Sequence, residues 1–235
     1  MSYRTAGVAA AVFSLAFSAL GTDPGHAQSS GSPPLSFAPV QTASDTARNE
    51  RLRAASEPFE KLTEISFDQS LAAIDRVIAE AQKSVAGLGN ALSAEGARQV
   101  RQQLSALRAA RTKADRVALA LSSIEIYRLL VTATSPGAKI PTEVYLLDYV
   151  GFRWNADLKA VPVRWDDMAL AASFARTNWA RLLPVLGTSA VSAKVSKALA
   201  DMEQSVAQRN APMAAAAVKA ELDVVDELEA FFAAR

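Results

Sequence analysis

The stretch from Val117 to Val161 constrains the fold of this chain more than any other. Between Val117 and Val131 it holds only five polar residues, which are Ser122, Ser123, Glu125, Tyr127 and Arg128. A helix that is apolar nearly all round is buried on several sides. The pattern therefore predicts a central helix that other elements of the fold cover.

Helical spacing of apolar residues continues through most of the chain after residue 43. Half of all residues are hydrophobic, and many are alanine, the strongest helix former. We therefore predict an all-α fold, an up-and-down helical bundle of four principal long helices with N-terminal helices packed alongside. It forms a single domain over residues 44–235.

Capping patterns predict where several helices begin. We expect starts at Ser66, Ser93 and Thr142, and expect Pro58 to end or kink the helix in which it lies, or to open a second one. The helix from Ser93 is predicted to run unbroken to about Ala133.

The N-terminal residues 1–27 have the order of a secretory signal peptide. Arg4 precedes an apolar run from Val8 to Leu20, which is too short to span a bilayer, and small residues follow. We place the cleavage after Ala27. Residues 28–43 are rich in Ser, Pro and Gly and predict a flexible segment. The expected location is periplasmic, or alternatively extracellular, without stable membrane insertion after cleavage.

This cleavage removes His26, the only histidine, from a chain that has no cysteine. A mature protein without imidazole or thiol cannot perform Ser-His-Asp or Cys-His catalysis and cannot build a Cys/His zinc site. The formal net charge of +1 gives no electrostatic reason to expect nucleic acid as a partner. We predict a protein that is not an enzyme and has no catalytic residues.

The central stretch places charged residues where a core is expected. Glu125 and Arg128 are three positions apart on one helix, so they can pair with each other. A buried charge needs a partner. Two interpretations stay open: an internal structural ion pair, or the polar floor of a ligand site.

The following helices add further polar residues to apolar surfaces. Gly151 in a helix interior predicts a close approach, either of another helix or of a ligand. Glu221 falls inside the apolar arc of the last helix and is a candidate buried carboxylate. The candidate ligand-binding residues are Glu125, Arg128, Asp148, Tyr149, Arg153, Trp154 and Glu221.

These residues support a ranked set of functions. The first is an exported, non-catalytic binding or accessory protein for a small ligand or a hard cation. No cofactor is predicted, although carboxylates without imidazole suit an oxygen-ligated cation, whose identity is unknown. The alternative is a protein-interaction module that uses a helix face, such as the basic one from Arg98 to Arg116. A carboxylate-dependent hydrolase ranks below both.

Overall fold

The structure, a computed structural model, describes residues 42–235. In this part of the chain 81% of the residues are helical and there are no strands, so the predicted all-α helical bundle is confirmed. The helices are α1 (Ala43–Ile65), α2 (Leu71–Ala86), α3 (Ala94–Thr112), α4 (Arg116–Thr132), α5 (Thr142–Leu158), α6 (Trp165–Leu186), α7 (Ala190–Ala207) and α8 (Ala211–Ala233), with a short 3-10 helix η1 (Gly89–Ala91).

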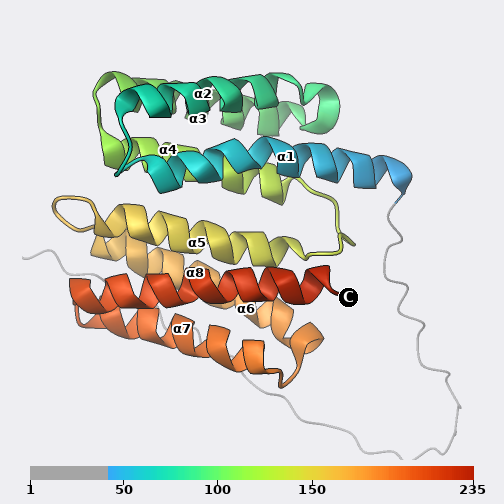
Figure 1. Cartoon of the computed structure of the whole chain (residues 1–235). Coiled ribbons are helices and arrows are strands. Elements are labelled where there is room, and N and C mark those ends of the chain that lie inside the picture. The colour runs from blue at the N-terminus through green and yellow to red at the C-terminus, as the bar shows by residue number, and fades with distance from the viewer. Residues whose placement is uncertain (1–41) are drawn as a thin grey trace, which may run out of the picture. The chain divides into compact units, whose positions relative to one another are not determined.

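The helices form two sets of four with the same order of contacts (Figure 1). In each set the first helix packs against the second and the fourth, and the third packs against the fourth. The sets α1–α4 and α5–α8 meet where α4, and to a smaller extent α1, packs against α5. We call this junction the seam.

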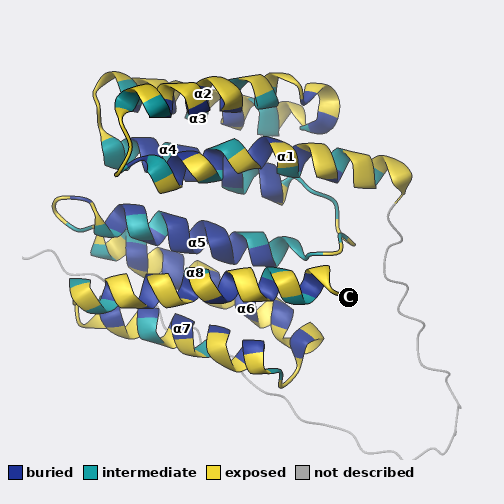
Figure 2. Ribbon diagram, viewed as in Figure 1, coloured by how far each residue is buried: buried dark blue, intermediate teal, exposed yellow. Residues whose placement is uncertain are grey.

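The two helices at the seam are the most enclosed part of the fold. Eleven of the 17 residues of α5 are buried, and α4 buries residues on several of its faces (Figure 2). The prediction from the all-round apolar pattern of Val117–Val131 is thus confirmed. Polar side chains on α4 and α5 consequently lie at or near the seam, where burial raises the cost of leaving them unpaired.

The prediction of one unbroken helix from Ser93 to about Ala133 is wrong, because this stretch forms two helices, α3 and α4. Ala114 adopts a left-handed conformation with φ of 52°, which no helix continues through. Asp115 then caps α4, since its side chain accepts a hydrogen bond of 2.9 Å from the amide of Ala118. The break lets α3 fold back and pack against α4.

Three other boundaries differ from the predicted ones. The second helix begins after Ser70 rather than at Ser66, whose hydroxyl donates to a carbonyl in the last turn of α1. Helix α1 continues through Pro58. Thr142 is the first residue of α5, and Pro141 occupies the capping position without a side-chain hydrogen bond.

The predictions for the N-terminus lie largely outside the described residues. The signal peptide over 1–27 belongs to this part, as does nearly all of the segment 28–43. Helix α1 begins at Ala43, one residue before the predicted start of the domain, and Thr42 caps it. Within residues 42–235, none of the helices combines the length and the hydropathy needed to cross a membrane.

Candidate functional site

The polar residues of α4 and α5 open into two separate clefts at the seam. The first, the arginine cleft, is lined by Glu125, Arg128, Tyr149, Arg153, Leu170, Ala171 and Phe174. The second, the acidic cleft, is lined by Arg53, Ser56, Glu57, Glu60, Tyr127, Tyr145, Asp148, Asp226 and Glu229. Helix α6 borders the first cleft, whereas α1 and α8 border the second.

Glu125 is the centre of a hydrogen-bonded cluster in the arginine cleft. Its Oε2 accepts from Arg128 Nε at 2.9 Å, so the predicted ion pair forms. Its Oε1 accepts from Arg153 Nη1 at 2.5 Å and from the Tyr149 hydroxyl at 2.6 Å. Both oxygens of this carboxylate therefore accept hydrogen bonds from side chains of the protein itself. This favours the interpretation of Glu125 and Arg128 as an internal structural ion pair.

The cluster extends to Asp157, a residue that the sequence analysis did not single out. The Asp157 side chain is fully buried, 3.6 Å from Arg153 Nε and 3.1 Å from Arg164 Nε. Burial raises the pKa of Asp157 to about 6, although both arginines act to lower it. The chain of charges thus joins α4 and α5 to the turn before α6.

The acidic cleft differs because its charges are not neutralised in this way. Helix α1 contributes Glu57 and Glu60, α5 contributes Asp148, and α8 contributes Asp226 and Glu229. They surround a cavity of about 260 Å³. Within residues 42–235, none of these five carboxylates has an Arg or Lys nitrogen within 4.0 Å. The cleft therefore gathers five carboxyl groups that form no ion pair of 4.0 Å or less within these residues.

The carboxylates lie at different depths. Glu57 and Asp226 are exposed at the opening, and Glu60 and Glu229 are half-buried. Asp148 is only 9% exposed, and its Oδ2 accepts a hydrogen bond of 3.0 Å from the buried Tyr127 hydroxyl. Its Oδ1 has no hydrogen-bond donor in the described part of the chain. Asp148 thus presents a free oxygen at the floor of the cleft.

Burial and crowding shift the protonation of these groups. Burial, with the charge of Glu64 adding to it, raises the pKa of Glu60 to about 7. Burial also raises the pKa of Asp148 well above its usual range and raises that of Glu229, each helped by neighbouring carboxylates. The raised pKa values favour the protonated forms of these carboxylates, and the value of about 7 for Glu60 places its titration near neutral pH. A cation that enters the cleft would favour the charged forms and release those protons.

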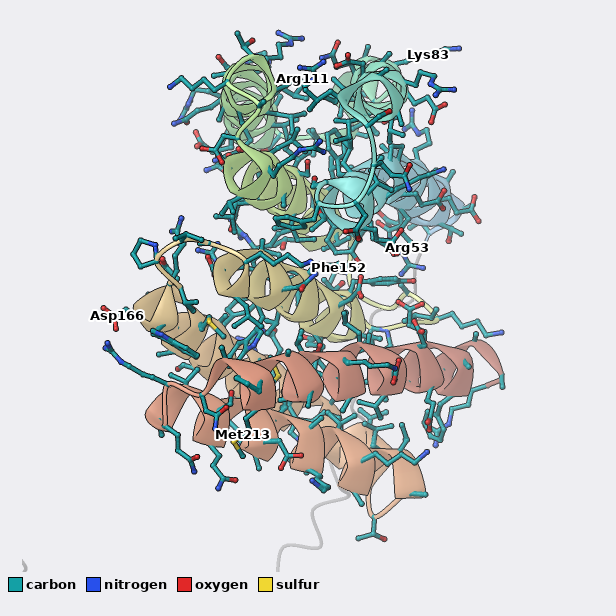
Figure 3. All side chains as sticks on the ribbon, turned by 60° about the vertical axis from the view of Figure 1, so that its left-hand side comes forward. Arg53, Lys83, Arg111, Phe152, Asp166 and Met213 are labelled. Carbon is teal, nitrogen blue, oxygen red and sulfur yellow. The ribbon has the colours of Figure 1, made fainter. Side chains whose placement is uncertain are left out.

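Arg53 is the one positively charged side chain among the described residues that line the acidic cleft. Its guanidinium carbon lies 4.8 Å from the centre of the Tyr145 ring, and its Nη2 donates to the carbonyl of Ile140 at 3.1 Å. Figure 3 shows Arg53 at the level where the two sets of helices meet. The cleft therefore already places a planar cation against an aromatic face.

Glu221 lies in neither cleft but in the contact between α5 and α8. It is fully buried, and neither carboxylate oxygen has a hydrogen-bond partner in residues 42–235. Burial and then the charge of Asp148 raise the pKa of Glu221 well above its usual range, which favours the neutral acid. A Cβ added at Gly151 would overlap Glu221 Oε2, so the close approach predicted there is made by another helix, α8.

The candidate residues from the sequence are therefore brought together only in part. Asp148 opens into the acidic cleft, Glu221 is enclosed between helices, and Trp154 is fully buried in the core and lines neither cleft. Four residues do meet in the arginine cleft, and these are Glu125, Arg128, Tyr149 and Arg153.

No protein-family model, curated protein or solved structure matches this chain. The helical fold by itself does not specify a function, since one fold hosts many. The chemistry of the two clefts therefore has to carry the functional argument.

The acidic cleft is built mainly from residues that the sequence analysis did not select, among them Glu57, Glu60, Asp226 and Glu229. A signal for them exists. Glu57 and Glu60 are three residues apart on α1, and Asp226 and Glu229 are three residues apart on α8, so the two residues of each pair share one helix face. In both pairs that face borders a buried stripe, which includes Phe59 on α1 and other apolar residues on α8.

The arrangement of the acidic residues bears on which cation could bind. Nowhere in residues 42–235 do three or more His, Cys, Asp or Glu side chains converge in a way that could hold a metal ion. The carboxylates of the acidic cleft are instead distributed around its cavity.

Two basic residues of the stretch from Arg98 to Arg116, Arg111 on α3 and Arg116 at the start of α4, have partners within the protein. Arg111 makes two hydrogen bonds, of 2.6 and 2.7 Å, to the carboxylate of Asp75 on α2. Arg116 donates at 2.8 Å to the carbonyls of Ser66 and Gln69 in the turn between α1 and α2. The exposed large apolar residues of the described chain lie away from α3, at Val161, Leu170, Phe174, Leu183 and Val185.

Proposed function

We propose that this protein binds a small organic cation in the acidic cleft and performs no catalysis there. One observation carries the proposal: five carboxylates line one cavity without an ion-pair partner, and the buried Asp148 has a free oxygen at its floor. A buried carboxylate without an ion-pair partner is costly, so a fold that keeps Asp148 beside four other carboxylates around one cavity has a use for their charge.

The chemistry of the lining favours an ammonium or guanidinium group over a metal ion. A hard metal ion needs six or more oxygens at short distances around one point. The cleft instead has its carboxylates spread around a cavity and has two tyrosines in its wall, Tyr127 and Tyr145. Aromatic faces attract organic cations, as Arg53 against Tyr145 illustrates within this protein.

The electrostatics supply both attraction and a pH dependence. The raised pKa values of Glu60, Asp148 and Glu229 favour their protonated forms before a cation binds, and the pKa of Glu60 is about 7. A bound cation lowers those pKa values and displaces protons. Affinity for the cation should therefore rise with pH, most strongly around the pKa of about 7 of Glu60.

The proposed place of action is the periplasm, with the extracellular space as the alternative. The support is the signal-peptide pattern of residues 1–27 and the removal of His26 with it. A binding protein of this kind captures or carries its ligand and needs neither imidazole nor thiol. The proposal is therefore compatible with a mature protein that has no histidine and no cysteine.

Isothermal titration of the mature protein with monoamines, diamines and guanidinium compounds, with magnesium and calcium chloride alongside, tests the proposal. We expect at least one amine or guanidinium compound to bind with release of protons, measured as heats that depend on the buffer. Asp148→Asn keeps an acceptor for Tyr127 but removes the charge, and should weaken binding about tenfold or more.

Asp68→Asn serves as the matched control, because Asp68 is exposed in the turn between α1 and α2 and lines neither cleft. It should leave the affinity unchanged. Absence of binding for every organic cation would refute the proposal, as would equal effects of Asp148→Asn and Asp68→Asn.

A further inference from the structure

We infer that the ligand is a linear aliphatic diamine, with one ammonium group at Asp148 and the other at the opening between Glu57 and Asp226. This inference rests on the proposed function, since it names the class of cation that the acidic cleft takes. Three features of the described residues support it: the depth of the carboxylates, their number, and their spacing along α1 and α8.

The depth of the cleft defines two positions for positive charge. Asp148 lies at the floor with Oδ1 free, and the Tyr127 hydroxyl fixes the orientation of its carboxylate through Oδ2. Glu57 and Asp226 lie at the opening, where both are exposed. A ligand that reaches the floor from the opening passes both positions, so a charge at each end meets a carboxylate at each end.

The number of carboxylates exceeds what one charge can neutralise. Five carboxylates and one arginine line the cleft. Arg53 is held by Tyr145 and the carbonyl of Ile140 and makes no ion pair of 4.0 Å or less with the cleft carboxylates of the described chain. A single ammonium group at Asp148 would leave Glu57 and Asp226 without a partner. A second ammonium group placed near them neutralises the opening as well.

The carboxylates repeat at a short interval along two walls of the cleft. Glu57 and Glu60 are one helical step of three residues apart, which is about 4.5 Å along α1, and Asp226 and Glu229 repeat this step along α8. A chain of a few methylene groups between two ammonium groups is long enough to span one such interval along either wall. Its apolar middle would lie beside Tyr145, the half-buried aromatic side chain of the wall.

Putrescine and n-butylamine test this inference, because they share the same carbon chain and differ in one amine. Titrations at pH 8 and 150 mM salt, which screens long-range attraction, compare their affinities. We expect putrescine to bind about tenfold more tightly than n-butylamine. Asp148→Asn should weaken the binding of both compounds.

Changes at the opening make the test specific. The double variant Glu57→Gln, Asp226→Asn should lower the affinity for putrescine to that for n-butylamine and should change the affinity for n-butylamine less than about twofold. Both substitutions are at exposed positions, so folding is expected to persist. Asp68→Asn again controls for the loss of negative charge elsewhere.

The possible outcomes distinguish failure of the diamine inference from failure of the proposed function. Equal affinities for the two amines would overturn the diamine inference and leave organic-cation binding intact. Equal losses for both amines in the double variant would overturn it too, because the opening would then act through overall charge. Failure of every amine and guanidinium compound to bind would refute both.

Discussion

Replacing Gly151 with alanine should destabilise this protein, although alanine is the better helix former. Gly151 lies within α5, at the point where α5 passes close to α8. An added Cβ would overlap Glu221 Oε2 and would lie 2.5 Å from Cδ2 and 2.8 Å from Cγ of Leu222. The Cγ atom is the branch point of Leu222, so a simple rotation of the side chain cannot clear it.

Two opposing effects set the magnitude. Alanine in place of glycine within a helix adds about 1 kcal/mol to the free energy of unfolding. Overpacking of a filled core removes about 1–3 kcal/mol. Since the overlap involves a fully buried carboxylate and a leucine branch point, we expect the upper end of this range and a net loss of about 2 kcal/mol. For a domain of this size such a loss lowers the melting temperature by about 4–8 °C.

Urea denaturation followed by circular dichroism measures the change, with Gly96→Ala as the matched control. Gly96 lies in the first turn of α3, and a Cβ there would meet only Ser93 Oγ, at 3.3 Å, and the Leu92 side chain, neither of which belongs to another helix. The control should be as stable as the original protein or up to about 1 kcal/mol more stable. A Gly151→Ala protein that gains stability as the control does would refute the close packing of α5 against α8.

Two further predictions concern charge. The raised pKa of Glu60, about 7, together with the raised values of Glu229, Asp148 and Glu221, means that the folded state binds more protons than the unfolded state above pH 4.5. The stability that these groups contribute is thus fully present below pH 4.5 and is lost as the pH rises through the folded pKa values. Urea titrations should show decreasing stability from pH 5 to pH 8, less steeply in Glu60→Gln than in the exposed control Glu80→Gln; a flat or rising profile would contradict this. Glu125→Gln, which removes the charge at the centre of the arginine cleft, should lower the free energy of unfolding by about 1–2 kcal/mol, while Glu95→Gln, in an exposed pair with Arg98, should change it by about 0.5 kcal/mol or less. Equal effects of these two substitutions on the denaturation midpoint would show that the cluster adds no stability.

The sequence predicts the helical architecture well because its signals are local and periodic. The apolar character of Val117–Val131 identifies the enclosed helix α4, and Gly151 identifies a close contact between helices. The three-residue spacing of Glu125 and Arg128 identifies their ion pair. Each of these features depends on the spacing of residues along one helix, or on a residue type, such as glycine, that is unfavourable in a helix without a packing reason.

The sites were less accessible to such reasoning for a physical reason. Glu125 and Tyr127 are two residues apart, so they project in directions about 200° apart around α4, and the clefts they line are different. Periodicity shows that both are near the core but does not show which helix each will face. Glu57 and Glu229 look like ordinary solvated positions until α1 and α8 are placed around the same cavity.

The separation of these residues along the chain has a consequence for assembly. Helix α1 is the first and α8 the last of the described helices, and the walls of the acidic cleft come from both. Contacts between distant segments form late, because the loop that joins them must close first. During synthesis from the N-terminus, Glu57 and Glu60 therefore emerge well before Asp226 and Glu229. The cavity is complete only when α8 has been made and has folded against α5, so binding of the proposed cation would report that folding has finished.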